Sequence, residues 1–298
     1  MATPQAFLSN PIDMDQVRTV AQRSEELGFR DLWTTESTFG KNNTLEPSVL
    51  LSYVAAVTST AKLGVSVLVF PLHSPVHVAR RIGALDQVSG GRAIVGLGLG
   101  DRSGPYPAFG LTPERRVRRF EEGVRLMKAL WTQPSTQHHG DFYRLDDASM
   151  EPKPVQRPYP PIWLGGGHTN VLRRAVSIAD GWMGAGASST ADFKQRVLEL
   201  RRLLNEAGRD PDTFTISKRV FIAVDSDTAR AERELRRWTG AVYHDSDIAS
   251  KVSIWGSPER CAELLEDLAS VGVYHLLLSP VYAQEEQLEA VAEVSGLK

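Results

Sequence analysis

The chain has 298 residues, of which 42% are hydrophobic and 23% charged, and these ordinary proportions exclude wholesale disorder. Its 34 basic and 36 acidic residues give a formal charge of -2, so no basic excess indicates nucleic-acid binding. Cys261 is the one cysteine, which excludes a disulfide framework within a single chain. The first residues lack the layout of a signal peptide, and no apolar run approaches the roughly 18 residues of a membrane span. These features predict a cytoplasmic protein that does not enter the membrane.

Short apolar runs alternate with amphipathic segments along the chain, and this alternation predicts strands followed by helices. The predicted strands are Gln5–Ser9, Arg30–Thr35, Lys62–Phe70, Arg92–Gly96, Pro161–Leu164, Gly181–Ala185, Thr213–Val224 and Val273–Leu278. The predicted helices are Met14–Leu27, Pro47–Ser59, Pro75–Val88, one from Thr112 to about Trp131, Thr169–Ala179, Asp192–Ala207, Thr228–Trp238, Pro258–Val271 and Gln284–Val294. We expect Thr112 to cap the fourth helix, with Pro113 at its first position.

Two stretches interrupt this alternation. Ser135–Gln137 and Phe142–Leu145 flank a turn and predict a small hairpin after the fourth helix, and Ala249–Ser257 has the composition of a linker. Strands that alternate with helices indicate a parallel sheet with helical crossovers. Eight such units favour a (β/α)8 TIM barrel of the α/β class, formed by residues 1–298 as a single domain.

The active sites of such barrels lie where strands end, so polar and glycine-rich strand ends are candidate sites. The fourth strand ends in Gly96–Gly100, followed by Asp101. A dinucleotide-binding fingerprint needs a third glycine where Asp101 stands, and no helix opens directly behind it. The glycines therefore indicate either a strand without room for side chains or a strand end that admits a flat ligand. Asp101 is a candidate general acid or base.

A second glycine run, Gly165–Gly167, follows the fifth predicted strand and precedes a helix that starts near Thr169. Backbone N–H groups and the positive end of a helix dipole suit a phosphate at this position. The alternative is a flexible turn that binds nothing.

The histidines do not indicate a metal site. His73 and His77 are four residues apart but are separated by Pro75, and His138 and His139 fall in the predicted hairpin turn, where we expect them to be solvated. Cys261 lies within a predicted helix, where a buried and unreactive thiol is expected.

Four arginines lie at the start of the fourth predicted helix. They form either a solvated face or a receptor for the anionic tail of a cofactor, and they are Arg115, Arg116, Arg118 and Arg119.

Several stretches together resemble the luciferase-like flavin-dependent oxidoreductases. The resemblance is carried by SPVHVARRIGALDQVSGGR at 74–92, which runs on into IVGLGLG, and by EPKPVQRPYPPIWLGGG with AVSIADGW at 151–182. The earlier ELGFRDLWTTES and the later GSPERCAELLEDLASVGVYHLLL also fit, so the similarity spans nearly the whole chain.

The resemblance implies a barrel that binds a flavin or the deazaflavin coenzyme F-420, with the ring over the strand ends. It also implies a bulge with a non-proline cis peptide near Ser66 and Val67. The resemblance implies that six residues contact the cofactor. It also implies that Glu36 and Asp101 transfer protons, with His73 as a further candidate. The six residues are Ser66, Val67, Gly165, Gly166, Gly167 and His168.

The sequence departs from the family pattern at Ser37. Family members that use coenzyme F-420 often carry an acid followed by histidine after the second strand, and here Glu36 is followed by serine. A serine cannot act as a cationic proton donor near neutral pH. Asp101 is also one methylene shorter than the glutamate that is common at its position.

The sequence and spacing of these motifs resemble the F-420-dependent branch of the family. The resemblance therefore predicts coenzyme F-420 as the cofactor and hydride transfer to or from a small organic substrate as the reaction. One alternative is an FMN-dependent monooxygenase on the same scaffold. Another is a non-catalytic flavin-binding protein that has lost its proton donor. The resemblance also allows a homodimer.

Overall fold

The computed structural model describes residues 1–3, 11–39 and 44–297. Its main sheet has eight strands in the order β1-β2-β3-β6-β7-β8-β10, with β9 beside β8, and every pairing in it is parallel. The strands of this sheet are β1 (Asp31–Thr34), β2 (Lys62–Val69), β3 (Ala93–Gly98), β6 (Ile162–Gly165), β7 (Gly181–Gly184), β8 (Thr215–Val224), β9 (Ser253–Gly256) and β10 (His275–Pro280). A separate antiparallel pair consists of β4 (Thr136–His139) and β5 (Arg144–Ala148).

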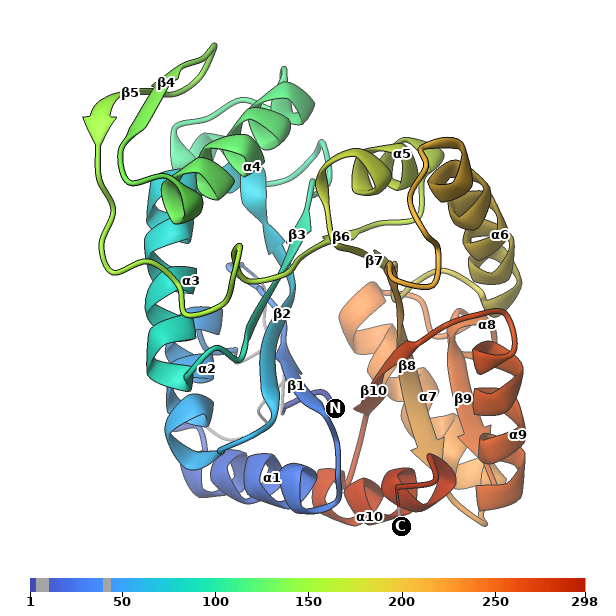
Figure 1. Cartoon of the computed structure of the whole chain (residues 1–298). Helices are drawn as coiled ribbons and strands as arrows, with labels where there is room; N and C mark the ends of the chain where they lie inside the picture. The colour runs from blue at the N-terminus through green and yellow to red at the C-terminus, as the bar shows by residue number, and fades with distance from the viewer. Residues whose placement is uncertain (4–10, 40–43, 298) are drawn as a thin grey trace.

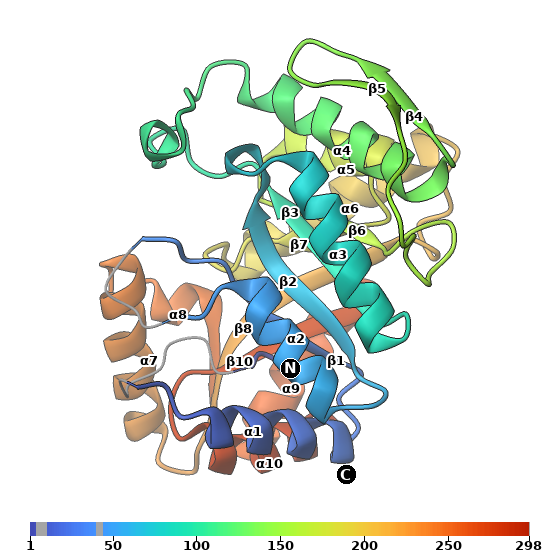
Figure 2. The same cartoon turned by 90° about the vertical axis from the view of Figure 1, so that its left-hand side faces the viewer.

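Helices surround this curled sheet, so the fold is α/β (Figure 1). They are α1 (Met14–Glu26), α2 (Pro47–Val57), α3 (Pro75–Ser89), α4 (Arg116–Thr132), α5 (Thr169–Ile178), α6 (Thr190–Glu206), α7 (Thr228–Tyr243), α8 (Ala249–Val252), α9 (Pro258–Ala269) and α10 (Gln284–Val294), with short 3-10 turns η1 (Phe70–Leu72) and η2 (Tyr106–Phe109). Figure 2 shows β4 and β5 beyond α4 at one end of the molecule and α1 beside α10 at the other. No helix within the described residues is long and apolar enough to span a membrane.

Residues 1–3 lie between β1 and β10 (Figure 1). The Ala2 N–H donates to the Leu278 carbonyl of β10 at 2.8 Å, and the Thr3 N–H donates to the Trp33 carbonyl of β1 at 2.8 Å. The first predicted strand, Gln5–Ser9, lies outside the described residues.

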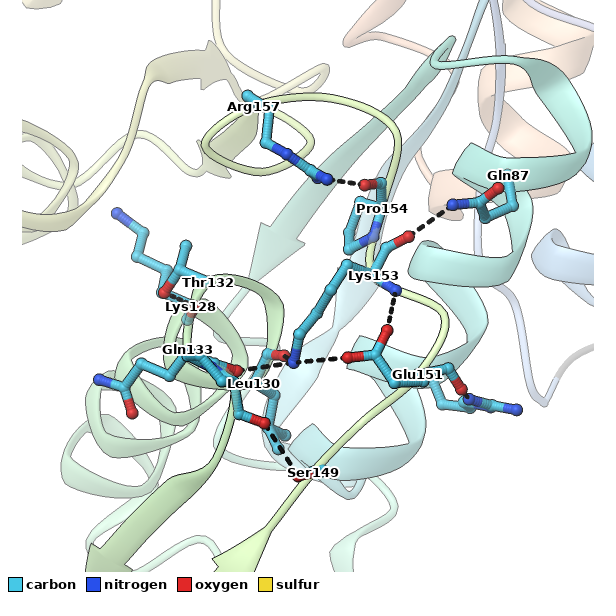
Figure 3. Close-up of polar contacts among 12 residues, drawn as sticks. Gln87, Lys128, Leu130, Thr132, Gln133, Ser149, Glu151, Lys153, Pro154 and Arg157 are labelled. Carbon is cyan, nitrogen blue, oxygen red and sulfur yellow. Dashed lines mark hydrogen bonds and ion pairs between the residues drawn. The ribbon is translucent and has the colours of Figure 1, made fainter.

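The proline-rich stretch at 151–161, which carries part of the family resemblance, connects helices α3 and α4. The Lys153 ammonium donates to the last carbonyls of α4, at 3.0 Å from Leu130 O and 2.7 Å from Gln133 O (Figure 3). A cation there also complements the negative end of the helix dipole. Gln87 of α3 donates to the Lys153 carbonyl at 2.6 Å. This motif is therefore a structural anchor.

The predicted start of the fourth helix is wrong. The helix begins at Arg116, because the Arg116 N–H closes a turn onto the Pro113 carbonyl at 3.3 Å and Arg115 adopts a φ of 58°. That backbone conformation lies outside the right-handed helical region, so Thr112 cannot cap this helix.

The predicted linker Ala249–Ser257 is also wrong, because it contains α8 and β9. Strand β9 pairs in parallel with β8, from Ser253 opposite Phe221 to Gly256 opposite Val224. Its four residues are too few to show a periodicity in the sequence.

His138 and His139 lie in β4 and not in a turn. The expectation that they are solvated is confirmed for His139, whose side chain is 46% exposed, and is wrong for His138. His138 Nε2 lies 3.2 Å from Glu122 Oε1, and this side chain is 18% exposed. Glu122 also accepts N–H bonds from Asp141, Phe142 and Tyr143, which join the β4–β5 connection to α4.

Three of the four arginines at the start of α4 contact the same connection, and they are Arg115, Arg118 and Arg119. Arg115 pairs with Asp141, and its guanidinium carbon lies 4.7 Å from the centroid of the Phe142 ring. Arg119 lies 5.0 Å from the same ring, so both arginines pack against the hairpin.

Candidate active site

A bulge in β2 lies near the end of that strand where the candidate site was expected. The register between β2 and β3 shifts between Val65 and Leu68, and the Ser66–Val67 peptide is cis, as the family resemblance implied. Thr35, just after β1, donates its hydroxyl hydrogen to the Ser66 carbonyl at 2.7 Å. Two neighbouring strand ends are thereby joined at the bulge.

The glycines of β3 and β6 make room for the Val67 side chain. A Cβ at Gly98 would lie 2.6 Å from Val67 Cγ2, and one at Gly165 would lie 2.8 Å from Val67 Cγ1. A Cβ at Gly96 would lie 2.2 Å from the Val65 carbonyl oxygen. Both distances to Val67 are too short for real side chains, so these positions require glycine. Of the two interpretations of Gly96–Gly100, the structure supports a strand without room for side chains.

The second glycine run ends in a more open segment. Gly166 has a φ of 140°, donates its N–H to Met183 O at 3.1 Å and accepts from the Trp182 indole at 2.7 Å. Gly167, in contrast, has open space where a Cβ would stand.

His168 occupies the N-cap position of α5, and its Nδ1 accepts from the Asn170 N–H at 3.1 Å. The described residues provide no hydrogen-bond acceptor for the N–H groups of Gly167 and Thr169. These donors lie at the positive end of the helix dipole, and such an arrangement suits a phosphate oxygen.

Glu36 and His73 form an acid–histidine pair. Glu36 Oε1 lies 2.6 Å from His73 Nε2, and Glu36 Oε2 accepts from the Val69 N–H at 2.6 Å. The Glu36 and His73 side chains are only 8% and 13% exposed. The loops after β1 and β2 therefore supply the two partners, whereas the neighbouring Ser37 donates its hydroxyl to the Phe39 carbonyl at 3.4 Å. A partly buried imidazole paired with a carboxylate can take up or release a proton.

Asp101 is exposed, in the segment between β3 and η2. Its Oδ1 accepts from the Ser103 N–H at 3.1 Å, and bonds from Ser103 hold the pKa of this carboxyl below its ordinary value. Asp101 is therefore ionised at neutral pH, which suits a base better than an acid. Within the described part of the chain it makes no hydrogen bond or ion pair with Glu36 or His73.

A cavity of about 630 Å³ adjoins Glu36, whereas His73 is not among the described residues that line it. The residues that line it include Thr35, Glu36, Ser37, Arg219 and Ser279. The described residues that complete the wall include Trp238, Tyr243 and Tyr282.

Sequence reasoning missed Arg219 and the aromatic side chains. The available signal was the pair Lys218-Arg219 within an otherwise apolar predicted strand. Lys218 is buried, which lowers its pKa to about 8, and its ammonium donates to the Ser188 carbonyl at 3.0 Å.

The protein-family model of the luciferase-like monooxygenases matches residues 1–252, which is most of the chain. The chain belongs to this family. As a luciferase-like protein, it is 31% identical over 257 residues to the F-420-dependent glucose-6-phosphate dehydrogenase of Kineococcus radiotolerans, covering 83% of this chain and 74% of that protein. It is 29% identical over 314 residues to the FMNH(2)-dependent dimethylsulfone monooxygenase of Pseudomonas putida, covering 92% of this chain and 85% of that one.

Among solved structures, this luciferase-like protein is similar to an F-420-dependent secondary alcohol dehydrogenase in complex with an F-420–acetone adduct. The TM-score is 0.85, and the match covers 95% of this chain and 94% of the other at 20% identity. This likeness shows a shared fold.

Proposed function

We propose that the chain is an oxidoreductase that uses coenzyme F-420 for hydride transfer to or from a small organic substrate. The observation that carries the proposal is the contact between Glu36 and His73. Glu36 directly follows Thr35, whose hydroxyl is hydrogen-bonded to the Ser66 carbonyl in the bulge. The relatives named as F-420-dependent dehydrogenases support this choice of cofactor.

Six residues are proposed to hold the cofactor, in two groups. Ser66 and Val67 would support the ring at the bulge, and the phosphate would meet the donors at Gly167 and at the start of α5. The second group also includes Gly165, Gly166 and His168, which lie beside these donors. The cofactor, when bound, supplies a carbon that carries the hydride.

The remaining chemistry falls to the protein's own side chains. His73 would donate a proton to, or accept one from, the substrate oxygen through its imidazole, while Glu36 orients the ring and compensates its charge. The Val69 N–H fixes the other carboxylate oxygen of Glu36. Asp101 is proposed as a second group that handles protons, as the family resemblance implies. His73 supplies the imidazole that Ser37 does not.

The alternative is an FMN-dependent monooxygenase, which the relationship to the dimethylsulfone monooxygenase favours. A non-catalytic flavin-binding protein has less support, because the Glu36–His73 pair provides the proton donor whose absence at position 37 suggested it.

The finer architecture is part of the same proposal. A closed (β/α)8 barrel formed by residues 1–298 as one domain, with β4–β5 as an insertion, is supported by the hydrogen bonds of Ala2 and Thr3 to β10 and β1. A cytoplasmic location is supported by the single, buried Cys261, and burial raises the pKa of its thiol to about 11. A homodimer rests on the family resemblance alone.

A parallel titration with coenzyme F-420 and FMN tests the function. We expect the purified protein to quench or shift the fluorescence of F-420 and to leave that of FMN unchanged. Tight binding of FMN without a response to F-420 would overturn the proposal in favour of the monooxygenase. Failure to bind either compound would contradict both.

A further inference from the structure

Lys218 is a buried cation that the proposed mechanism does not use. This residue of β8 is 1% exposed, and its ammonium lies 3.0 Å from the carbonyl oxygen and 3.4 Å from the hydroxyl oxygen of Ser188. The ammonium also lies 5.0 Å from the centroid of the Phe193 ring of α6. Lys218 is therefore covered by α6 and by segment 185–188, which follows β7 and precedes that helix (Figure 1).

Among the described residues, no opposite charge compensates this ammonium. Neither segment 185–188 nor β7 contains an ionisable side chain. The charged and titratable groups on the elements around Lys218 bond to other partners, and they are Asp192, Lys194 and Arg196 of α6, Arg219 of β8 and His275 of β10. Burial is therefore the cause that lowers the pKa of Lys218 from 10.5 to about 8.

Segment 185–188 has few bonds to the rest of the structure. Ser188 closes a turn within it, because its N–H and its hydroxyl donate to the Ala185 carbonyl at 3.0 Å and 2.6 Å. Within the described part of the chain, the hydrogen bonds that join the segment to other elements come from Lys218. The next residue, Ser189, lines a cavity of about 400 Å³, so packing does not confine this end of the segment.

The elements on both sides of the segment contact the proposed phosphate site. Arg196 of α6 donates to the Thr169 hydroxyl at the start of α5, at 3.1 Å. The Gly166 N–H, next to Gly167, donates to the Met183 carbonyl of β7 at 3.1 Å. A movement of segment 185–188 would therefore take place beside the donors that we assign to the phosphate.

We propose that segment 185–188 is a flap that closes over the Lys218 amine, and that protonation of this amine favours the open flap. Water solvates an exposed ammonium, whereas the closed flap offers it only Ser188 among the described residues. Burial of the neutral amine costs less free energy, so closure becomes more favourable as the pH rises from about 8 toward 10.5, the ordinary pKa of lysine. Control of the phosphate site by this flap rests on the proposed function, whereas the coupling of the flap to a proton does not.

Competitive acetylation of the protein without cofactor measures the open flap. Trace acetic anhydride reacts with neutral, accessible amines, and the exposed Lys251 of α8 serves as internal reference. The ratio of acetylation at Lys218 to that at Lys251 reports the open fraction, because the ionisation of an exposed lysine cancels. We expect this ratio to fall about tenfold or more between about pH 7.5 and about pH 9.5, since closure then releases a proton. A ratio that stays constant or rises would overturn the inference.

Alkylation of Cys261 distinguishes the flap from unfolding of the whole chain. This thiol of α9 is 0% exposed, so a reagent reaches it only when the surrounding core opens. Relative to an exposed lysine and a free cysteine respectively, we expect Lys218 to be at least about tenfold more accessible than Cys261. Equal accessibility of the two groups would show global unfolding and contradict the flap.

Two serine variants locate the opening. Ser188→Gly removes the hydroxyl bond to Ala185 and adds backbone freedom, so it should raise the Lys218 ratio about tenfold at neutral pH. Ser149→Gly is the matched control, because the exposed Ser149 also donates its hydroxyl to a backbone carbonyl, that of Pro134 at 2.8 Å, and the ratio should not change. An unchanged ratio in Ser188→Gly would place the opening elsewhere and overturn the inference.

These measurements need no cofactor, so their failure is separate from that of the function. Binding of coenzyme F-420 without a pH-dependent acetylation ratio would refute the flap alone. A pH-dependent ratio without binding of F-420 or FMN would refute the proposed function alone.

Discussion

At the residue scale, the structure places His73, a candidate proton donor, beside Glu36, although the residue that follows Glu36 in the sequence is a serine. Glu36 and His73 are 37 positions apart, and a hydrogen bond of 2.6 Å joins them across two loops. Replacement of His73 by Gln would keep a hydrogen-bond donor for Glu36 but remove the group that can transfer a proton.

We expect His73→Gln to slow the turnover of coenzyme F-420 about a hundredfold or more, the usual contribution of a positioned acid or base. Cofactor affinity should stay close to that of the parent, because the backbone that holds the cofactor does not change. Absorbance of the deazaflavin measures turnover, and fluorescence titration measures affinity. His77→Gln, at an exposed position on α3, is the matched control. Turnover that is unchanged in His73→Gln would remove this residue from the mechanism.

The residues of this pair could be identified from the sequence, but their pairing could not. Glu36 follows a predicted strand and His73 follows the next, so both could be placed at one edge of the sheet. Which side chains meet there depends on the bulge at Ser66–Val67 and on the turn of η1, which set the direction of the loop that carries His73. Arg219 was missed because a charged residue within a strand has no motif of its own.

At the scale of elements, strand β3 and the loop after β6 contain glycine for two different physical reasons. Gly98 makes room for Val67, whereas Gly167 has open space around it. The two positions are therefore expected to respond differently to the same added methyl group.

Gly98→Ala should lower the free energy of unfolding by about 1–3 kcal/mol, because the new Cβ would overlap the Val67 side chain. Gly167→Ala should change it by less than about 1 kcal/mol and should weaken cofactor binding instead. Urea denaturation and fluorescence titration measure the two effects. Equal losses of stability in both variants would contradict this division of roles.

The order of helices and strands followed largely from hydrophobic periodicity, and α10 has the predicted bounds of Gln284–Val294. Prediction failed where local geometry is not encoded in a pattern. The four residues of β9 are recognised only by their pairing with β8, and α4 starts late because Arg115 adopts a left-handed conformation.

At the scale of the whole molecule, acid stability depends in part on Glu25, which joins α1 to the segment that enters β2. Its carboxylate accepts N–H bonds from Ser59, Thr60 and Ala61 at 2.6–3.0 Å. Burial alone would raise the pKa of Glu25, but these bonds outweigh burial and lower it from 4.5 to about 2.

Because the pKa of Glu25 is depressed on folding, its contribution is fully present above about pH 4.5 and is lost as the pH falls toward 2. Glu25→Gln should lower the free energy of unfolding at pH 7 by about 1 kcal/mol, a value reduced for solvent screening. It should also flatten the pH dependence between 4.5 and 2. Glu26→Gln is the control, because Glu26 is 62% exposed in a surface ion pair. Identical acid titration curves for Glu25→Gln and the parent, measured by urea denaturation, would contradict this role.

The most direct test of the central claim is a crystal structure of the protein with coenzyme F-420. We predict that the deazaflavin ring lies against Ser66–Val67, with the Glu36–His73 pair near its reacting edge and the phosphate at Gly167 and the start of α5. A ring bound away from the bulge, or a phosphate that does not contact these N–H groups, would contradict the account.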